Sequence, residues 1–142
     1  MATINILLAE DDEVDVMAVK RAFQTMKIAN PLFVVNDGIE ALEILRGTNG
    51  RTRLPRPFII LLDLNMPRMG GLEFLDELRK DPELHSSVVF VMTTSADEQD
   101  RISAYEKNIA GYVLKHSVAH SFMDAISMLE HYWRVVELPE IQ

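Results

Sequence analysis

The sequence predicts a three-layer α/β fold built on a doubly wound parallel sheet of five strands. Five short apolar runs alternate along the chain with five stretches of helical periodicity. Alternation of this kind joins parallel strands through crossover helices. The runs are almost wholly apolar, as expected for strands that helices cover on both faces.

The first part of the chain supplies three strands, two helices and a long loop. The strands expected there are INILLA at 4–9, LFVVN at 32–36 and FIILLDL at 58–64. Apolar residues recur at three- and four-residue spacing over 14–26 and over 38–46, which predicts a helix in each stretch. Residues 47–57 hold Gly, Asn and Pro and are interpreted as a polar loop.

The remainder of the chain continues the alternation. GLEFLDELRK at 71–80 has the pattern of a helix that closes before Pro82. The acids that open 97–108 favour a helix N-terminus there. A long amphipathic helix is expected over 117–136. The strands expected between these helices are SVVFVMTTS at 87–95 and GYVLK at 111–115.

Composition bounds the class of protein. The chain has 142 residues, of which 48% are hydrophobic and 25% charged, and these values predict one globular domain over 1–142 with a tail at 137–142. A net charge of −8 argues against nucleic acid as a direct partner. The chain has no cysteine, which excludes disulfides and thiolate chemistry. No apolar run approaches the roughly 20 residues that span a bilayer, and no basic leader precedes the first run, so we expect a cytoplasmic protein without a membrane partner.

Polar side chains gather where the predicted strands end. In a doubly wound sheet, ligands bind beyond the carboxyl ends of the strands. The residues expected at these ends, in strand order, are Glu10, Asp11 and Asp12; Asn36 and Asp37, which we place at the periphery; Asp63; Thr93, Thr94 and Ser95; and Lys115.

This constellation has the groups that phosphoryl transfer onto a carboxylate requires. Crowded carboxylates repel each other unless a cation lies among them. Mg²⁺ suits a few carboxylates, a backbone carbonyl and waters, with one position left for a phosphoryl oxygen. Lys115 can pair with that phosphoryl group or with Asp63, and a Thr hydroxyl can donate to another oxygen.

Each residue alone has a simpler interpretation. An acid after a strand, such as Asp12 or Asp37, commonly caps a turn or helix. The run from Thr93 to Ser95 could cap the next helix, and Lys115 could be a solvated strand end. The convergence of all of them on one edge of the sheet favours the functional interpretation.

Four motifs carry a resemblance to a known family: ILLAEDD, LLDLNMPRMGGLEFL, VMTTS and GYVLK. Asp63 precedes Thr93 by 30 residues, and Thr93 precedes Lys115 by 22. With these motifs the chain resembles the receiver domains of two-component response regulators over essentially its whole length. The resemblance implies the flavodoxin-like receiver fold and a phosphorylation-switched signalling protein in place of an ordinary turnover enzyme.

The resemblance also implies a role for each matching residue. Asp63 would be the phosphoacceptor, Lys115 would bind the phosphoryl group, and Thr93 would be the switch hydroxyl. Tyr112 falls where receivers carry a rotating aromatic residue, although it could also be an ordinary aromatic residue of the strand. Asp11 and Asp63 would contact Mg²⁺ directly and Glu10 through water. The implied metal ligands are Glu10, Asp11, Asp63 and, through its backbone carbonyl, Asn65.

One position departs from the receiver pattern. Receivers commonly follow the lysine with a proline, often in cis, and this chain has His116 there. A non-proline cis bond is costly, so the loop after Lys115 is expected to take another shape. His116 and His120 have the four-residue spacing of a metal pair, although surface and helix-start histidines are far commoner.

The insertion at 47–57 and the ending HYWRVVELP resemble single-domain response regulators that serve phytochrome-type sensor histidine kinases. This resemblance implies a sensor histidine kinase as donor, a protein as downstream target, and a homodimer formed through the last helix and tail. We place the dimer surface on Phe122, Leu129, Trp133 and Val136. The alternative is that this stripe simply packs on the sheet.

Two other functions compete with the phosphorylation switch. A pseudo-receiver acting as a constitutive interaction domain should have lost Asp63 or Lys115, and both are present. A small-molecule phosphohydrolase with an Asp nucleophile usually has a second Asp two residues later, where this chain has Asn65. A phosphorelay intermediate would look identical in sequence to the leading interpretation.

Overall fold

A computed structural model describes residues 3–139, and within them the predicted fold class is confirmed. Five parallel strands form one sheet in the order β2-β1-β3-β4-β5. The strands are β1 (Asn5–Ala9), β2 (Leu32–Val35), β3 (Phe58–Leu62), β4 (Val88–Thr93) and β5 (Gly111–Leu114). Of the expected tail, residues 140–142 lie outside the described residues.

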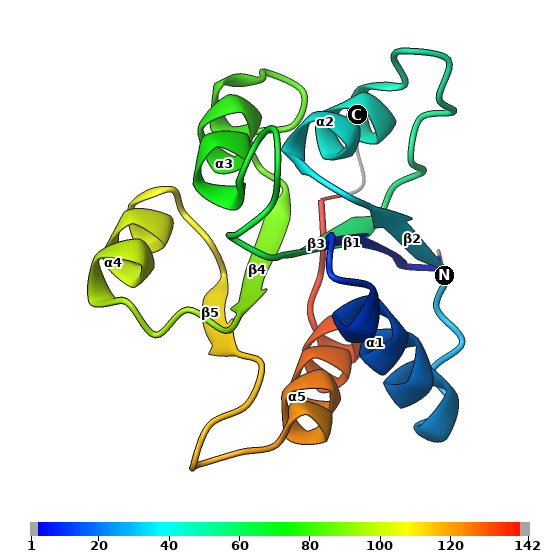
Figure 1. Ribbon diagram of the computed structural model, residues 1–142. Coiled ribbons are helices and arrows are strands. Elements are labelled where there is room, and N and C mark those ends of the chain that lie inside the picture. The colour runs from blue at the N-terminus through cyan, green and yellow to red at the C-terminus, as the bar shows by residue number, and fades with distance from the viewer. Residues whose placement is uncertain (1–2, 140–142) are drawn as a thin grey trace.

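Helices cover both faces of the sheet, which gives the three layers (Figure 1). On one face lie α2, α3 and α4, and on the other lie α1 and α5. Their bounds are α1 (Glu13–Thr25), α2 (Gly38–Arg46), α3 (Gly71–Lys80), α4 (Glu98–Glu106) and α5 (Phe122–Val135). None of the described helices has the length and apolar character needed to cross a bilayer.

The two central strands, β1 and β3, are buried at every residue. Successive side chains of a strand point to opposite faces of the sheet. Leu7 and Ile60 therefore join the cluster beneath α2 and α3, whereas Ile6 and Ile59 join the cluster beneath α1 and α5. This double coverage explains why the strands were recognisable as unbroken apolar runs.

The loop at 47–57 contains no helix or strand, as predicted, but it is anchored along its length. Gly47 ends α2 in the left-handed region, with φ of 70°. Leu54 is buried, and its N–H donates to the Ile44 carbonyl at 2.8 Å. Arg51 pairs with Glu43 at 3.3 Å. The loop is therefore tied to the last turn of α2 through Ile44 and Glu43.

The last helix begins later than predicted. The expected start was residue 117, but α5 begins at Phe122. Ser121 accepts from the Asp124 N–H at 3.1 Å, and Asp124 accepts from the Ser121 N–H at 3.0 Å. This reciprocal capping box fixes the start of the helix, because it satisfies backbone donors that the helix leaves unpaired.

Two of the four residues predicted to form a dimer surface on α5 are buried within the single chain. Leu129 is fully buried and Trp133 is 2% exposed, both in the core that α5 shares with α1 and the sheet. Trp133 packs against Phe23 with ring centroids 6.0 Å apart. Phe122 also packs partly against this core, and Val136 is half-buried. Leu129 and Trp133 thus pack on the sheet, as the alternative interpretation of the stripe expected.

Candidate metal centre

Three carboxylates meet at the carboxyl edge of the sheet, between β1 and β3. Glu10 and Asp11 follow β1, and Asp63 follows β3. Ligand oxygens of these three residues lie within 4.8 Å of one another. The strand order reverses between β1 and β3, which is where ligands bind in doubly wound sheets. The order of strands and helices in the sequence predicts this meeting of the three residues for the same reason.

The carboxylates differ in exposure. Glu10 is 2% exposed and Asp63 is 7% exposed, whereas Asp11 is exposed to solvent. Asp63 Oδ1 accepts a hydrogen bond from the Leu64 N–H at 2.9 Å, which orients the carboxylate. Glu10 Oε2 accepts from the Asp12 N–H at 3.2 Å. Glu10 and Asp63 therefore form a buried, hydrogen-bonded floor of the site, and Asp11 lies on its solvent-exposed side.

Lys115 supplies the positive charge of the site. It follows β5, is 2% exposed, and its Nζ lies 2.6 Å from Glu10 Oε1. The same Nζ lies 2.6 Å from Asp15 Oδ2 and 3.8 Å from Asp63 Oδ2. The alternative that Lys115 is a solvated strand end is wrong.

Burial controls the protonation of these groups. Burial raises the pKa of Glu10 from 4.5 to about 7, and the nearby charge of Asp63 adds to the rise while the hydrogen bond from Lys115 opposes it. Burial disfavours the charge of Lys115, but hydrogen bonds to Asp15 and Glu10 outweigh it and raise the pKa of the ammonium. Lys115 is therefore charged, and Glu10 takes up a proton more readily than an ordinary glutamate does.

The donor set fits a hard divalent cation. Carboxylate oxygens at this spacing are the ligands that such ions prefer. A cation would offset the repulsion among Glu10, Asp11 and Asp63, which one lysine neutralises incompletely. Asn65 is exposed in the loop after β3, two residues beyond Asp63.

The remaining predicted residues lie on β4 and β5. Thr93 is fully buried at the end of β4, and its Oγ1 accepts from the Ser95 N–H at 3.2 Å. Tyr112 is half-buried on β5, and its hydroxyl donates to the Ser95 carbonyl at 2.9 Å. Burial raises the pKa of the Tyr112 hydroxyl. Thr93 and Tyr112 are thus both connected to Ser95.

Of the residues that could cap a helix, Asp12 and Asp37 do so and Ser95 does not. Asp12 caps α1 by accepting from the Val14 and Asp15 N–H groups, and Asp37 caps α2 by accepting from the Glu40 N–H. Ser95 does not cap α4, because Asp97 accepts from its first N–H groups. Asp12 and Asp37 thus have the ordinary structural role that the sequence analysis considered for them.

The structure shows the shape of the loop after Lys115, where His116 replaces the proline that is common in receivers. The Lys115–His116 peptide bond is trans. His116 is exposed, and His120 contacts the Leu114 carbonyl at 2.8 Å and Ser117 Oγ at 3.1 Å. His120 thus closes the loop over 116–121, which argues against a His116–His120 metal pair.

Asp15 is the site residue that sequence reasoning missed. It lies in the first turn of α1, where acids commonly occur because they favour the positive end of the helix dipole. That ordinary explanation conceals its contact with Lys115, which is 100 residues away in sequence. Its four-residue spacing from Asp11 was the one available signal.

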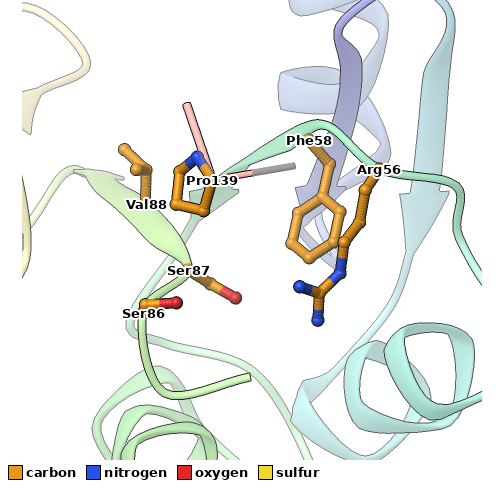
Figure 2. A pocket seen from close by; sticks show the side chains of 6 residues that line it. All are labelled: Arg56, Phe58, Ser86, Ser87, Val88 and Pro139. Atoms are coloured by element: carbon orange, nitrogen blue, oxygen red, sulfur yellow. The ribbon is translucent and has the colours of Figure 1, made fainter. Parts of the chain in front are cut away.

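A small hollow at the opposite end of the sheet has a different character (Figure 2). It lies where β3 and β4 begin, and Figure 2 shows Arg56, Phe58, Ser86, Ser87, Val88 and Pro139 around it. The Arg56 guanidinium lies 5.9 Å from the centroid of the Phe58 ring. The hollow lacks the carboxylate cluster, so the candidate site is the edge near Asp63.

Comparison with known proteins agrees with this geometry. A family model described as the response regulator receiver domain matches residues 6–127. Response regulator Rcp1 from a Synechocystis strain is 35% identical over 94% of this chain and 92% of its own. The crystal structure of the phosphorylated cyanobacterial phytochrome response regulator RcpA is 31% identical, with a TM-score of 0.87 over 97% of this chain and 99% of that one. The Mn²⁺-bound form of Rcp1 is 34% identical, with a TM-score of 0.85 over 97% and 99%.

Proposed function

The chain belongs to the response regulator receiver domain family, and from that premise we propose that Asp63 accepts a phosphoryl group from a sensor histidine kinase. One observation carries the proposal: ligand oxygens of Glu10, Asp11 and Asp63 converge within 4.8 Å, and Lys115 Nζ lies 3.8 Å from Asp63. This arrangement supplies a nucleophile, a cation site and a resident positive charge at one place.

The chain's own residues position the nucleophile. The Leu64 N–H holds one oxygen of Asp63, and the other oxygen lies on the side of Lys115. In the transfer, a carboxylate oxygen of Asp63 forms a bond to phosphorus while the bond between phosphorus and the donor's leaving group breaks. Lys115 offsets the negative charge that the acyl phosphate brings.

We assign the metal site to Glu10, Asp11, Asp63 and the backbone carbonyl of Asn65, with Mg²⁺ as the physiological ion. The ion would offset charge on the phosphoryl oxygens when bound. Exposed Asp11 lies at the open side, and the buried Glu10 is suited to act through water. The manganese in the Rcp1 structure is that protein's ion, and it supports a divalent cation in this family position.

Thr93 and Tyr112 are proposed to report phosphorylation to the surface. Thr93 would turn its hydroxyl toward the phosphoryl group, and this would break the contact of its Oγ1 with the Ser95 N–H. Tyr112 holds the Ser95 carbonyl, so movement of this segment would release its ring. The pair therefore connects the site to the surface between β5 and α4.

The relatives support a proposal for the partners and the cellular location of this chain. RcpA is described as a phytochrome response regulator, and we propose a phytochrome-type sensor kinase as the donor for this chain. A single receiver domain over 1–142, a cytoplasmic location, a protein target and a homodimer belong to the same proposal. The exposed Met123, Met128 and Val135 of α5, together with half-buried Phe122 and the C-cap residue Val136, are apolar residues left for a dimer contact.

The test is intact mass after incubation with acetyl phosphate and Mg²⁺. One added phosphoryl group is expected in the wild type and none in Asp63→Asn or without metal. Asp12→Asn is the matched control, because asparagine also caps helices and Asp12 should be dispensable. A parallel binding measurement with beryllofluoride and Mg²⁺ detects a site whose phosphoryl group hydrolyses quickly.

Failure in both measurements would leave the alternative function, a pseudo-receiver that binds partners constitutively. That alternative also predicts that Asp63→Asn leaves partner binding unchanged. Labelling that persists in Asp63→Asn would instead place the phosphoacceptor at another residue.

A further inference from the structure

Lys115 has one anionic partner more than the proposed chemistry requires. Its ammonium group has three N–H donors. Two of them are engaged at 2.6 Å, by Glu10 and by Asp15, while Asp63 lies farther away at 3.8 Å. The described structure thus holds the lysine toward α1, away from the residue that is to carry the phosphoryl group.

Asp15 is held in place by the start of α1. Its backbone N–H donates to Asp12 Oδ1 at 3.3 Å, within the cap of that helix. Val19 and Phe23, farther along the same helix, are buried in the core beneath α1 and α5. A rigid helix therefore presents the Asp15 carboxylate to Lys115.

We propose that Asp15 is a positioning residue that competes with the phosphoryl group for Lys115. This inference rests on the proposed function of Asp63. In the unphosphorylated protein, Asp15 restrains Lys115. When a phosphoryl oxygen binds the ammonium, the contact between Asp15 and Lys115 breaks.

The difference in exposure between Glu10 and Asp15 determines which carboxylate releases Lys115 when a phosphoryl group binds. The Glu10 side chain is 2% exposed, so losing Lys115 would leave its buried Oε1 without that hydrogen-bond partner. The Asp15 side chain is 29% exposed and can turn to water at a smaller desolvation cost. The negative charge of Asp15 also opposes an incoming phosphoryl dianion. Asp15 therefore lowers the affinity of the site for the phosphoryl group.

The experiment measures the affinity of the full chain for beryllofluoride, a phosphoryl analogue, at saturating Mg²⁺. We expect Asp15→Asn to bind at least about threefold more tightly than the wild type, because an isosteric amide removes the competing charge. Glu13→Gln is the matched control: Glu13 lies on the same helical turn, is exposed, and also loses one negative charge. It should change the affinity much less.

A further measurement separates competition from a general loss of charge. In a Lys115→Ala background, Asp15→Asn should give no gain in beryllofluoride affinity, because there is no lysine to release. The comparison with Glu13→Gln needs no lysine variant, so it tests the same point even where Lys115→Ala does not fold.

The outcomes distinguish this inference from the proposed function. A wild type that binds no beryllofluoride overturns the proposed function and the inference with it. A wild type that binds, with unchanged or weaker binding in Asp15→Asn, overturns the competition and leaves the function intact. An equal gain in Glu13→Gln, or a gain that persists without Lys115, also overturns it.

Discussion

The Cβ position of Gly71 would lie 2.6 Å from the Asp63 carbonyl oxygen and 2.8 Å from the Leu64 Cα. Both neighbours are backbone atoms that cannot turn aside. The Gly71 N–H donates to the Leu64 carbonyl at 2.9 Å, so α3 begins directly against the segment that carries the nucleophile. Glycine at this position therefore sets the place of Asp63.

We predict that Gly71→Ala lowers the free energy of unfolding by roughly 1–3 kcal/mol, because the added methyl must push the backbone at Asp63. It should also weaken beryllofluoride binding. Denaturant melts and binding titrations check both effects, with exposed Glu73→Ala on the same helix expected to change stability by about 0.5 kcal/mol or less. Wild-type stability in Gly71→Ala would mean that the helix start can shift freely.

Asp37 gives a prediction for acid stability. It is 3% exposed; burial alone would raise the pKa of its carboxyl, but hydrogen bonds from the Glu40 N–H and from Arg68 lower that pKa below 3.8. A lowered pKa in the folded protein contributes stability above the unfolded value, and this is lost as pH falls through the folded value. Asp37→Asn keeps a helix cap but loses this contribution.

The stability difference between wild type and Asp37→Asn should therefore be constant from neutral pH to about 5 and shrink toward pH 3. Urea melts at a series of pH values measure it. Arg68→Gln should remove part of the same dependence, because the Arg68 guanidinium donates to Asp37 at 2.8 Å. A difference that does not vary with pH would show that the cap alone carries the role of Asp37.

At the scale of single residues, the sequence predicts the site residues that directly follow a strand, because sheet topology fixes where strand ends lie. Glu10, Asp11, Asp63 and Lys115 each follow a strand, so the parallel arrangement brings them to one edge. Asp15 lies on a helix, and its contact with Lys115 depends on how that helix packs. The pairing of Arg68 with Asp37 depends in the same way on where a loop crosses the edge.

At the scale of the elements, Arg79 links α3 by hydrogen bonds to the loops that precede β4 and β5. From the last turn of α3 it donates to the carbonyls of His85 and Ser87, before β4, and of Lys107 and Asn108, before β5, at distances of 2.7–2.9 Å. Burial lowers the pKa of its guanidinium. The planar fork can reach four carbonyls at once, which an ammonium cannot do.

We predict that Arg79→Met lowers the free energy of unfolding by roughly 2–3 kcal/mol, because it leaves partly buried carbonyls without donors. Arg79→Lys should recover only a small part of this loss. Arg134→Met is the matched control, since Arg134 is exposed and meets Glu130 at 3.6 Å, and we expect it to cost about 0.5 kcal/mol or less. Equal effects of the two methionine variants would contradict the role given to Arg79.

The α5 helix provides a pair of neighbouring residues with opposite environments. Leu129 is fully buried and Met128 is 45% exposed. Leu129→Ala should cost about 2–5 kcal/mol through a cavity in the core, whereas Met128→Ala should cost about 0.5 kcal/mol or less. Thermal or denaturant unfolding of the two variants measures the contrast. A large effect of Met128→Ala that depends on protein concentration would instead reveal a dimer contact there.

Element types were predictable from periodicity, and element ends were less so. Helix α2 has the bounds predicted for it, because Asp37 and Gly47 stand at its ends as a cap and a left-handed stop. The start of α5 was misplaced because residues 117–121 suit a helical pattern, and the Ser121 cap with the His120 contact decides otherwise. Local hydrogen bonds thus set boundaries that hydrophobic spacing leaves open.

At the scale of the whole molecule, alternation of strands and helices fixed the class of fold but not the order of the strands. The order β2-β1-β3-β4-β5 makes β1 and β3 interior strands, with β3 at the centre. Both have a neighbouring strand on each side and helices on each face, whereas β2 and β5 form the edges (Figure 1). The local stability of the strands should therefore decrease from the centre of the sheet to its edges.

Amide hydrogen exchange should reveal this gradient. Every residue of β1 and β3 is buried, and every residue of β5 is only half-buried. We predict that amides of Ile6–Ala9 and Ile59–Leu62 exchange only through global unfolding, while those of Tyr112–Leu114 exchange through local opening at rates about 10- to 100-fold higher. Native-state exchange at increasing denaturant distinguishes the two routes, because local opening depends little on denaturant. If β5 amides follow the same denaturant dependence as β3, then Tyr112 lies on a fully cooperative strand that Lys115 directly follows, and the switch proposed for Tyr112 would have to operate without local opening of the sheet edge.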